Sequence, residues 1–221
     1  MQDGPRFQRA DSGLQASEEA EEVDPSNSQP PFEGWRPSFN AQPRTIAPWM
    51  PASRSAGHHL GGRMADLDHI LSSVVGPGLA LLPSVMDTQR SRLMLLAIGL
   101  QESRFEHRRQ IGGPARGFWQ FEKGGGVVGV LTHPSTRKYA IEVCRERGIE
   151  PTAAAVYPAL ERDDLLACAF ARLLLYSDPK AIPAPGYPAA AWDYYIRNWR
   201  PGKPHRQTWD ALYKQAAGAV A

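Results

Sequence analysis

The stretch that decides the fold runs from Leu93 to Glu122 and reads LMLLAIGLQESRFEHRRQIGGPARGFWQFE. Its opening run, Leu93–Leu100, is apolar nearly all round a helix, which indicates a central buried element. The run leads directly to one carboxylate, Glu102, and then to Ser103. A loop that contains glycine follows, and then the turn Gly117-Phe118-Trp119-Gln120. The stretch therefore predicts an acid at the end of a buried helix, opposite an aromatic turn that carries an amide.

The chain from Met64 onward carries helical signals throughout. Apolar residues recur at the spacing of one helix face over Met64–Val75, and Gly76-Pro77-Gly78 is expected to end that helix. Further helices are predicted over residues 88–105, 134–147, 161–176, 189–199 and 207–217, with a proline-rich loop over 179–188. Because no stretch alternates like a β-strand, we predict a compact all-α domain over residues 64–221.

Residues 1–63 differ from the rest in composition. They are rich in Pro, Ser, Gln and Glu, include an acidic run over residues 18–24, and show no sustained apolar period. Such a segment buries too little apolar surface to offset the entropy cost of ordering it. We therefore predict a disordered, polar N-terminal extension.

Bulk properties exclude several classes of function. The chain has 25 basic and 23 acidic residues, a net charge of +2, and no dense basic stripe, so no nucleic-acid partner is expected. Its longest apolar run, Leu93–Leu100, is far shorter than the roughly 20 residues of a membrane span. The N-terminus lacks the apolar core of a signal peptide. We expect a soluble protein with no membrane span and no signal peptide.

No metal or organic cofactor is predicted. Cys144 and Cys168 fall in predicted helices, which favours free, partly buried thiols over a single disulfide and does not support a zinc site. The glycine run Gly124–Gly126 lacks the Lys-Ser/Thr pair and the preceding strand of a phosphate-binding loop.

Glu102 is the residue best placed for acid–base chemistry. Ile98 and Leu95 precede it on the same helix face, so its carboxylate is expected beside apolar surface. Desolvation raises the pKa of a carboxyl group, as a general acid requires near neutral pH. The alternative is a structural glutamate that caps the helix or pairs with a nearby arginine: Arg104, Arg108 or Arg109.

The turn before Glu122 supplies sugar-binding chemistry. Small residues precede Phe118 and Trp119, whose aromatic faces can stack on sugar rings, and the amide of Gln120 can donate and accept hydrogen bonds. The alternative is that the aromatic residues pack in the core, which is expected of at least one of them. Core packing does not explain the polar Gln120 between Trp119 and Phe121.

These residues resemble a known signature. Glu102-Ser103 followed by Gly117-x-x-Gln120, with Ala115 two places before the glycine, resembles the "ES … GLMQ" pattern of lysozyme-like lytic transglycosylases, which cleave peptidoglycan. Phe118-Trp119 departs from the usual Leu-Met, and Ile111 or Gly112 stands where the family often has serine.

A later element of the family is only half kept. Its Ala-Tyr-Asn-Ala-Gly segment has its nearest counterpart in Ala191–Tyr195, which retains tyrosine without Asn-Ala-Gly.

The resemblance implies a lysozyme-like fold, peptidoglycan glycan strands as substrate and Glu102 as the catalytic residue. Glu102 would protonate the glycosidic oxygen between N-acetylmuramic acid and N-acetylglucosamine, and would then accept the proton of the sugar's 6-hydroxyl to give a 1,6-anhydro product. Tyr195, or else Tyr194, would lie near Glu102. The expected substrate-binding residues are Ser103, Gly117, Phe118, Trp119, Gln120, Tyr194 and Tyr195.

A hydrolytic route would need a second carboxylate, since ordinary glycosidases use two. The candidates are Glu106, Glu122 and Asp193. Glu122 is the one to test, and its alternative is a surface acid paired with Lys123.

The basic residues His107, Arg108, Arg109 and Arg116 either meet the carboxylates of peptide stems or are solvated. The turn over residues 199–204 and Trp209 are expected to pack the last two helices together, in preference to contacting glycan.

A chain without a signal peptide and with a polar extension resembles phage proteins of this family. It would be virion-associated, or held in the host cytoplasm before release to the cell wall, and residues 1–63 could contact other virion proteins. Two further interpretations stay open: a lysozyme-like virion domain that has lost catalysis, and a helical interaction protein in which Glu102 is structural.

Overall fold

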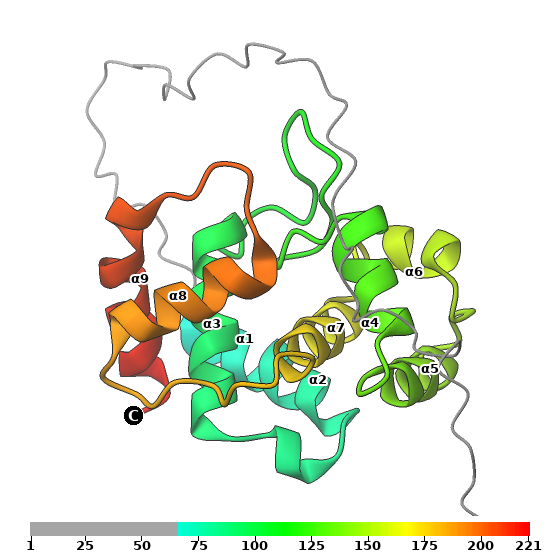
Figure 1. Ribbon diagram of the computed structural model, residues 1–221, viewed down its shortest axis with the longest axis horizontal. Coiled ribbons are helices and arrows are strands. Elements are labelled where there is room, and N and C mark those ends of the chain that lie inside the picture. The colour runs from blue at the N-terminus through cyan, green and yellow to red at the C-terminus, as the bar shows by residue number, and fades with distance from the viewer. Residues whose placement is uncertain (1–65) are drawn as a thin grey trace, which may run out of the picture. The chain divides into compact units, whose positions relative to one another are not determined.

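The computed structural model describes residues 66–221, which form helices joined by turns (Figure 1). The chain divides into two units, Met1–Ser38 and Phe39–Ala221, and the described residues belong to the second. No strand occurs within residues 66–221, where the only β-type pairing is two isolated bridges, so the all-α prediction is confirmed. The predictions of a disordered extension over residues 1–63 and of a domain that begins at residue 64 concern positions outside the described residues.

The helices follow one another in this order. The first group comprises α1 (Leu67–Ile70), a π-helical turn (Leu71–Val75), α2 (Gly76–Ala80), a 3₁₀ turn (Ser84–Met86) and α3 (Gln89–Ser103). A second π-helical turn (Lys123–Val127) precedes α4 (Val128–Thr132), α5 (Arg137–Glu146) and α6 (Ala153–Ala159). The chain closes with α7 (Asp164–Tyr176), α8 (Pro188–Trp199) and α9 (Arg206–Ala219).

The prediction that Gly76-Pro77-Gly78 ends the first helix is wrong. The π-helical turn runs directly into α2, and Pro77 lies in the first turn of α2, at the junction of the two helical segments. Gly78 serves close packing: a Cβ there would lie 2.6 Å from Cys168 Cβ. The short helix α6 was not expected, and its Pro158 occupies the last turn.

The centre of the fold is α3. Every residue of Leu93–Leu100 is buried, as the apolar run predicted. Thr88 caps the helix and forms a reciprocal capping box with Ser91, which defines the first turn. In Figure 1, α8 crosses in front of α3, and α9 packs along it and against α8. Helix α7 also contacts α3, and it packs against α4 and α5 as well.

Both cysteines are free and buried, so the prediction of free thiols is confirmed over a disulfide. Burial raises the pKa of Cys144 to about 11 and also raises that of Cys168, which keeps both thiols protonated. Within residues 66–221, none of the helices combines the length and the apolar character that crossing a membrane requires.

The close approach of α2 to α7 predicts a stability effect. Gly78→Ala should lower the free energy of unfolding by about 1–3 kcal/mol, because the new methyl group would overlap Cys168. The matched control is Gly129→Ala in α4, where a Cβ meets no atom within 4 Å. That change should leave stability equal or raise it by up to about 1 kcal/mol through helix propensity. Urea unfolding of both variants measures the difference, and equal effects would contradict the packing argument.

Candidate functional site

Glu102 lies in the last turn of α3, and the chain reverses directly after it. Arg104 and Phe105 both adopt left-handed backbone conformations, with φ of 58° and 56°, which ends the helix at Ser103. The reversal brings the Phe105 ring back onto α3 at Gly99, where a Cβ would lie 2.2 Å from the ring. The buried helix thus delivers Glu102 to its end while the chain folds back beside it.

The carboxyl of Glu102 is half-buried and accepts a side-chain hydrogen bond. Tyr195, on α8, donates a hydrogen bond from its hydroxyl to Glu102 Oε1 over 2.7 Å. Desolvation, the largest effect, and the negative charge of Glu122 raise the pKa of Glu102, the Tyr195 hydrogen bond lowers it, and together they bring it to about 7. Desolvation prevails, so this carboxyl can exchange a proton near neutral pH.

The two tyrosines named from the sequence have different environments. Tyr195 is buried against Glu102, and burial together with that carboxylate raises the pKa of its hydroxyl, so Tyr195 remains a donor. Tyr194 points elsewhere: its hydroxyl donates to the carbonyl of Leu175 over 2.6 Å. Successive helix positions face different directions, so only Tyr195 reaches the acid. The expected substrate contact at Tyr194 is therefore replaced by a structural role in holding α8 to α7.

The aromatic turn packs inward. Phe118 and Trp119 are 2% and 0% exposed, so in this structure neither ring offers a face to a sugar and both pack in the core, the alternative expected of at least one of them. Trp119 Nε1 donates to the carbonyl of Leu95 over 2.9 Å, and Phe105 contacts both rings edge-on. The physical reason is that the turn closes the open end of the core beside α3.

Ser103 and Gly117 also act within the protein. The buried Ser103 hydroxyl donates to the carbonyl of Phe118 over 2.7 Å and accepts from the amide of Phe105, which ties the end of α3 to the turn. Gly117 has φ of 73°, and a Cβ there would lie 2.8 Å from the carbonyl oxygen of Leu160. Both residues were expected at the substrate, and both instead hold the turn in place.

Gln120 is part-buried and held under strain. Its φ is 50°, and its Nε2 donates to the carbonyls of Gly117 at 2.8 Å and His107 at 3.2 Å. Left-handed conformations of residues other than glycine are costly and cluster at functional sites. Within residues 66–221 there are four such residues, Arg104, Phe105, Gln120 and Arg200. Three belong to the segments around Glu102, and Arg200 follows Trp199, whose indole donates to the carbonyl of Trp119.

Three acids were proposed as a second carboxylate, and all three are exposed. The charge of Glu122 acts on Glu102, as its effect on the Glu102 pKa records, and no ion pair with Lys123 appears among the described residues. Glu106 instead lies 3.8 Å from the imidazole of His107. Of the three acids, Glu122 is therefore the one whose charge raises the pKa of Glu102.

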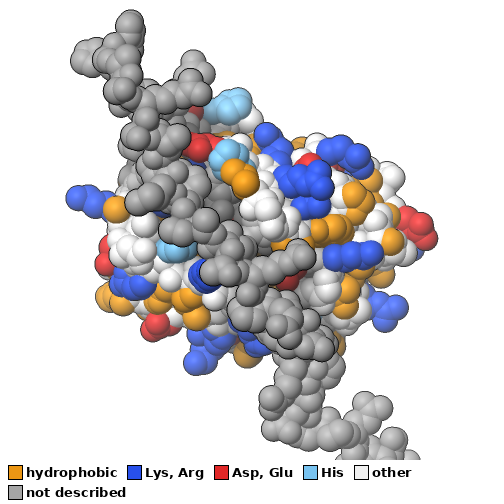
Figure 2. All heavy atoms as spheres, turned by 90° about the horizontal axis from the view of Figure 1, so that it is seen from above, with side chains coloured by type: hydrophobic (Ala, Val, Ile, Leu, Met, Phe, Trp, Pro, Cys, Tyr) orange, Lys and Arg blue, Asp and Glu red, His pale blue; other side chains and the backbone are white. Residues whose placement is uncertain are grey.

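Two of the basic residues near the turn form ion pairs. Arg108 makes a two-pronged contact of 2.7 Å with Asp164 and lies over the Phe118 ring, and Arg116 pairs with Glu161 at 2.9 Å. These contacts attach the segment after α3 to the start of α7. In Figure 2, basic and acidic side chains are both spread over the visible described surface, without a continuous basic stripe.

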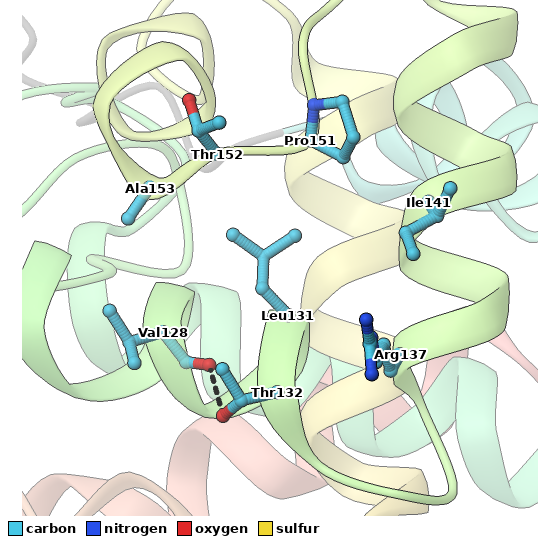
Figure 3. A pocket seen from close by; sticks show the side chains of 8 residues that line it. All are labelled: Val128, Leu131, Thr132, Arg137, Ile141, Pro151, Thr152 and Ala153. Atoms are coloured by element: carbon cyan, nitrogen blue, oxygen red, sulfur yellow. Dashed lines mark hydrogen bonds between the residues drawn. The ribbon is translucent and has the colours of Figure 1, made fainter.

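A separate hollow of about 500 Å³ lies between α4, α5 and the start of α6 (Figure 3). It is mostly apolar, Arg137 is its one charged lining residue, and no carboxylate lines it. It therefore lacks a group for acid–base catalysis. Within the described part of the chain, no group of three or more His, Cys, Asp or Glu residues is arranged to hold a metal ion.

The raised pKa of Glu102 predicts how stability depends on pH. Between pH 4.5, the ordinary value, and about 7, the folded protein binds more protons than the unfolded chain, so stability falls as pH rises through that window. Glu102→Gln removes the titration. The free energy of unfolding of this variant, taken relative to that of wild type, should therefore increase by about 1–3 kcal/mol from pH 4 to pH 8, as measured by urea unfolding.

Glu106→Gln is the control for this prediction, because Glu106 is exposed on the same segment. Its stability relative to wild type should differ between the two pH values by less than about 0.5 kcal/mol. If Glu102→Gln shows an equally flat difference, the carboxyl is not desolvated in solution.

Comparison with known proteins gives no relative for this chain: no family model matches it, and no significant match is found among curated proteins or solved structures. Function therefore has to be argued from the geometry around Glu102.

Proposed function

We propose that the protein is a peptidoglycan-cleaving enzyme with a lysozyme-like domain. It cuts the β-1,4 bond between N-acetylmuramic acid and N-acetylglucosamine, with Glu102 as the general acid and base. The observation that carries the proposal is the Glu102 carboxyl, which has a pKa of about 7 and accepts a hydrogen bond from Tyr195. A general acid works best when its pKa lies near the working pH.

The favoured chemistry is the non-hydrolytic route. Protonated Glu102 gives its proton to the glycosidic oxygen as the bond from that oxygen to the anomeric carbon breaks. The 6-hydroxyl of the same N-acetylmuramic acid then bonds to the anomeric carbon and returns its proton to Glu102, giving the 1,6-anhydro product. Because Tyr195 occupies Oε1, Oε2 is the oxygen left for both proton transfers. One carboxylate completes the cycle and no water is consumed.

A hydrolytic mechanism is the second candidate, and the position of Glu122 favours it. Glu122 is exposed and its negative charge raises the pKa of Glu102, as expected of a second carboxylate near the first. In that mechanism Glu122 would act as a base for water while Glu102 remains the acid.

The cellular setting is proposed from the sequence alone. A phage origin, with the protein carried in the virion or held in the host cytoplasm until it reaches the cell wall, accounts for the polar extension. Residues 1–63 would then contact other virion proteins.

Glu102→Gln should reduce clearing of purified cell wall by about 10²–10⁴-fold, because general acid–base catalysis contributes that much. Glu106→Gln, at an exposed residue, should retain wild-type activity. Since the first step needs protonated Glu102, wild-type activity should fall as pH rises above about 7. Turbidity assays from pH 5 to 9 measure all three. A wild-type protein that clears nothing at any of these pH values would reject the proposed enzyme.

Product chemistry separates the two mechanisms. Mass spectrometry of the soluble fragments should show 1,6-anhydro ends, each lighter by one water than a reducing end. Glu122→Gln should then retain most activity. Reducing ends alone, lost in Glu122→Gln, would reject the non-hydrolytic route in favour of the hydrolase.

A further inference from the structure

The first turn of α9 contacts the residue directly before Glu102. Gln101 Nε2 donates to the carbonyl of His205 over 3.2 Å, and the Thr208 hydroxyl, with one proton to donate, lies 3.0 Å from Gln101 Oε1 and 2.9 Å from the His205 carbonyl oxygen. Both ends of one amide are thus held by one turn of another helix. Gln101 cannot rotate with the end of α3 unless these hydrogen bonds break. The last turn of α3, which carries Glu102, is therefore attached to α9.

The next residue of α9, Trp209, contacts the partner of Glu102. Its indole lies face to face with the Tyr195 ring, with centroids 5.2 Å apart and planes 10° from parallel. Trp209 is 0% exposed, and its Nε1 donates to the carbonyl of Pro188 over 2.8 Å, at the start of α8. Trp192 packs against both rings, at 5.4 Å from Tyr195 and 5.5 Å from Trp209.

This packing constrains the Tyr195 hydroxyl. A tyrosine has two side-chain torsions, so fixing the plane of its ring fixes the direction of its C–O bond. The indole fixes that plane from one face, and the hydrogen bond to Pro188 prevents the indole from tilting. Offset stacking of two aromatic rings contributes about 0.5–1.5 kcal/mol beyond the area that it buries.

We propose that His205–Trp209 is a clamp that holds the Glu102 carboxyl and the Tyr195 hydroxyl against each other, with Thr208 and Trp209 as its positioning residues. Thr208 holds the acid through Gln101, and Trp209 holds the hydroxyl donor through ring stacking. The clamp concerns the geometry of the pair, and only its effect on turnover rests on the proposed function.

Loss of the clamp should change the pKa of Glu102, which loss of general stabilisation of the fold should not do. The Tyr195 hydrogen bond lowers the pKa of Glu102, which burial raises more strongly, and the net value is about 7. When the hydroxyl loses its position but the site stays closed, desolvation is no longer opposed, and the pKa of Glu102 rises. A residue that supports only the fold does not produce this change.

The test is a carboxyl-carbon NMR titration of the full-length protein labelled at the glutamate side chains, with the Glu102 signal assigned by its loss in Glu102→Gln. Trp209→Leu removes the stacking, and should move the Glu102 midpoint upward by about one pH unit, in the same direction as Tyr195→Phe. Trp209→Phe keeps an aromatic face, and should stay within about 0.3 pH units of wild type.

Substitutions of Thr208 test the clamp independently. Thr208→Val keeps the shape of the side chain without its hydroxyl and should move the midpoint upward, by less than Trp209→Leu. Thr208→Ser restores the hydroxyl and should return the midpoint to the wild-type value. The matched control is Leu212→Ala, which weakens the packing of the same helix at a half-buried residue and should leave the midpoint unchanged.

The outcomes separate the clamp from the proposed activity. An unchanged or lowered midpoint in folded Trp209→Leu overturns the clamp, whether or not the protein clears cell walls. A raised midpoint supports it even if wild type is inactive, in which case only the proposed function fails. If both hold, Trp209→Leu should lower kcat on soluble glycan strands about tenfold with little change in KM, because alignment and not binding is lost.

Discussion

The candidate site depends on one hydrogen bond, from the Tyr195 hydroxyl to Glu102 Oε1, between residues 93 positions apart in the chain. It joins the last turn of α3 to α8, and α9 packs against both helices. Burial around this bond gives Glu102 a pKa of about 7, while the bond opposes that rise. The chemistry of the carboxyl therefore results from two opposed effects that the helix packing sets together.

The site costs stability, and contacts around it offset the cost. A desolvated acid and three residues in left-handed conformations lie at or beside it, and each such feature is unfavourable by itself. The Ser103 hydroxyl ties the end of α3 to the turn, and ion pairs at Arg108 and Arg116 attach the same segment to the region around the start of α7. A functional site that is strained locally and supported by its surroundings fits the trade-off between stability and activity.

Local sequence patterns predicted the helices well and the aromatic turn poorly. The apolar run of α3 and the helical apolar spacing over residues 64–75 and 161–176 come from short-range patterns, which the sequence displays directly. Gly76-Pro77-Gly78 predicted the end of a helix, yet these residues lie in α2, which continues from a π-helical turn. Gly78 is small because Cys168 packs against it. Phe118 and Trp119 were expected at a sugar, yet both fill the core, since an aromatic ring suits either position and composition does not distinguish them.

The sequence by itself determined that the chain carries an all-helical domain, that α3 is central, and that Glu102 ends it beside apolar surface. These properties follow from the periodicity and the composition of contiguous segments. Only the tertiary structure decided that Tyr195 and not Tyr194 meets the acid, that Glu122 is the carboxylate whose charge it feels, and that the first turn of α9 holds the pair. Those choices depend on the crossing of helices far apart in the chain, and helix rotation and crossing geometry are set by packing across the whole core.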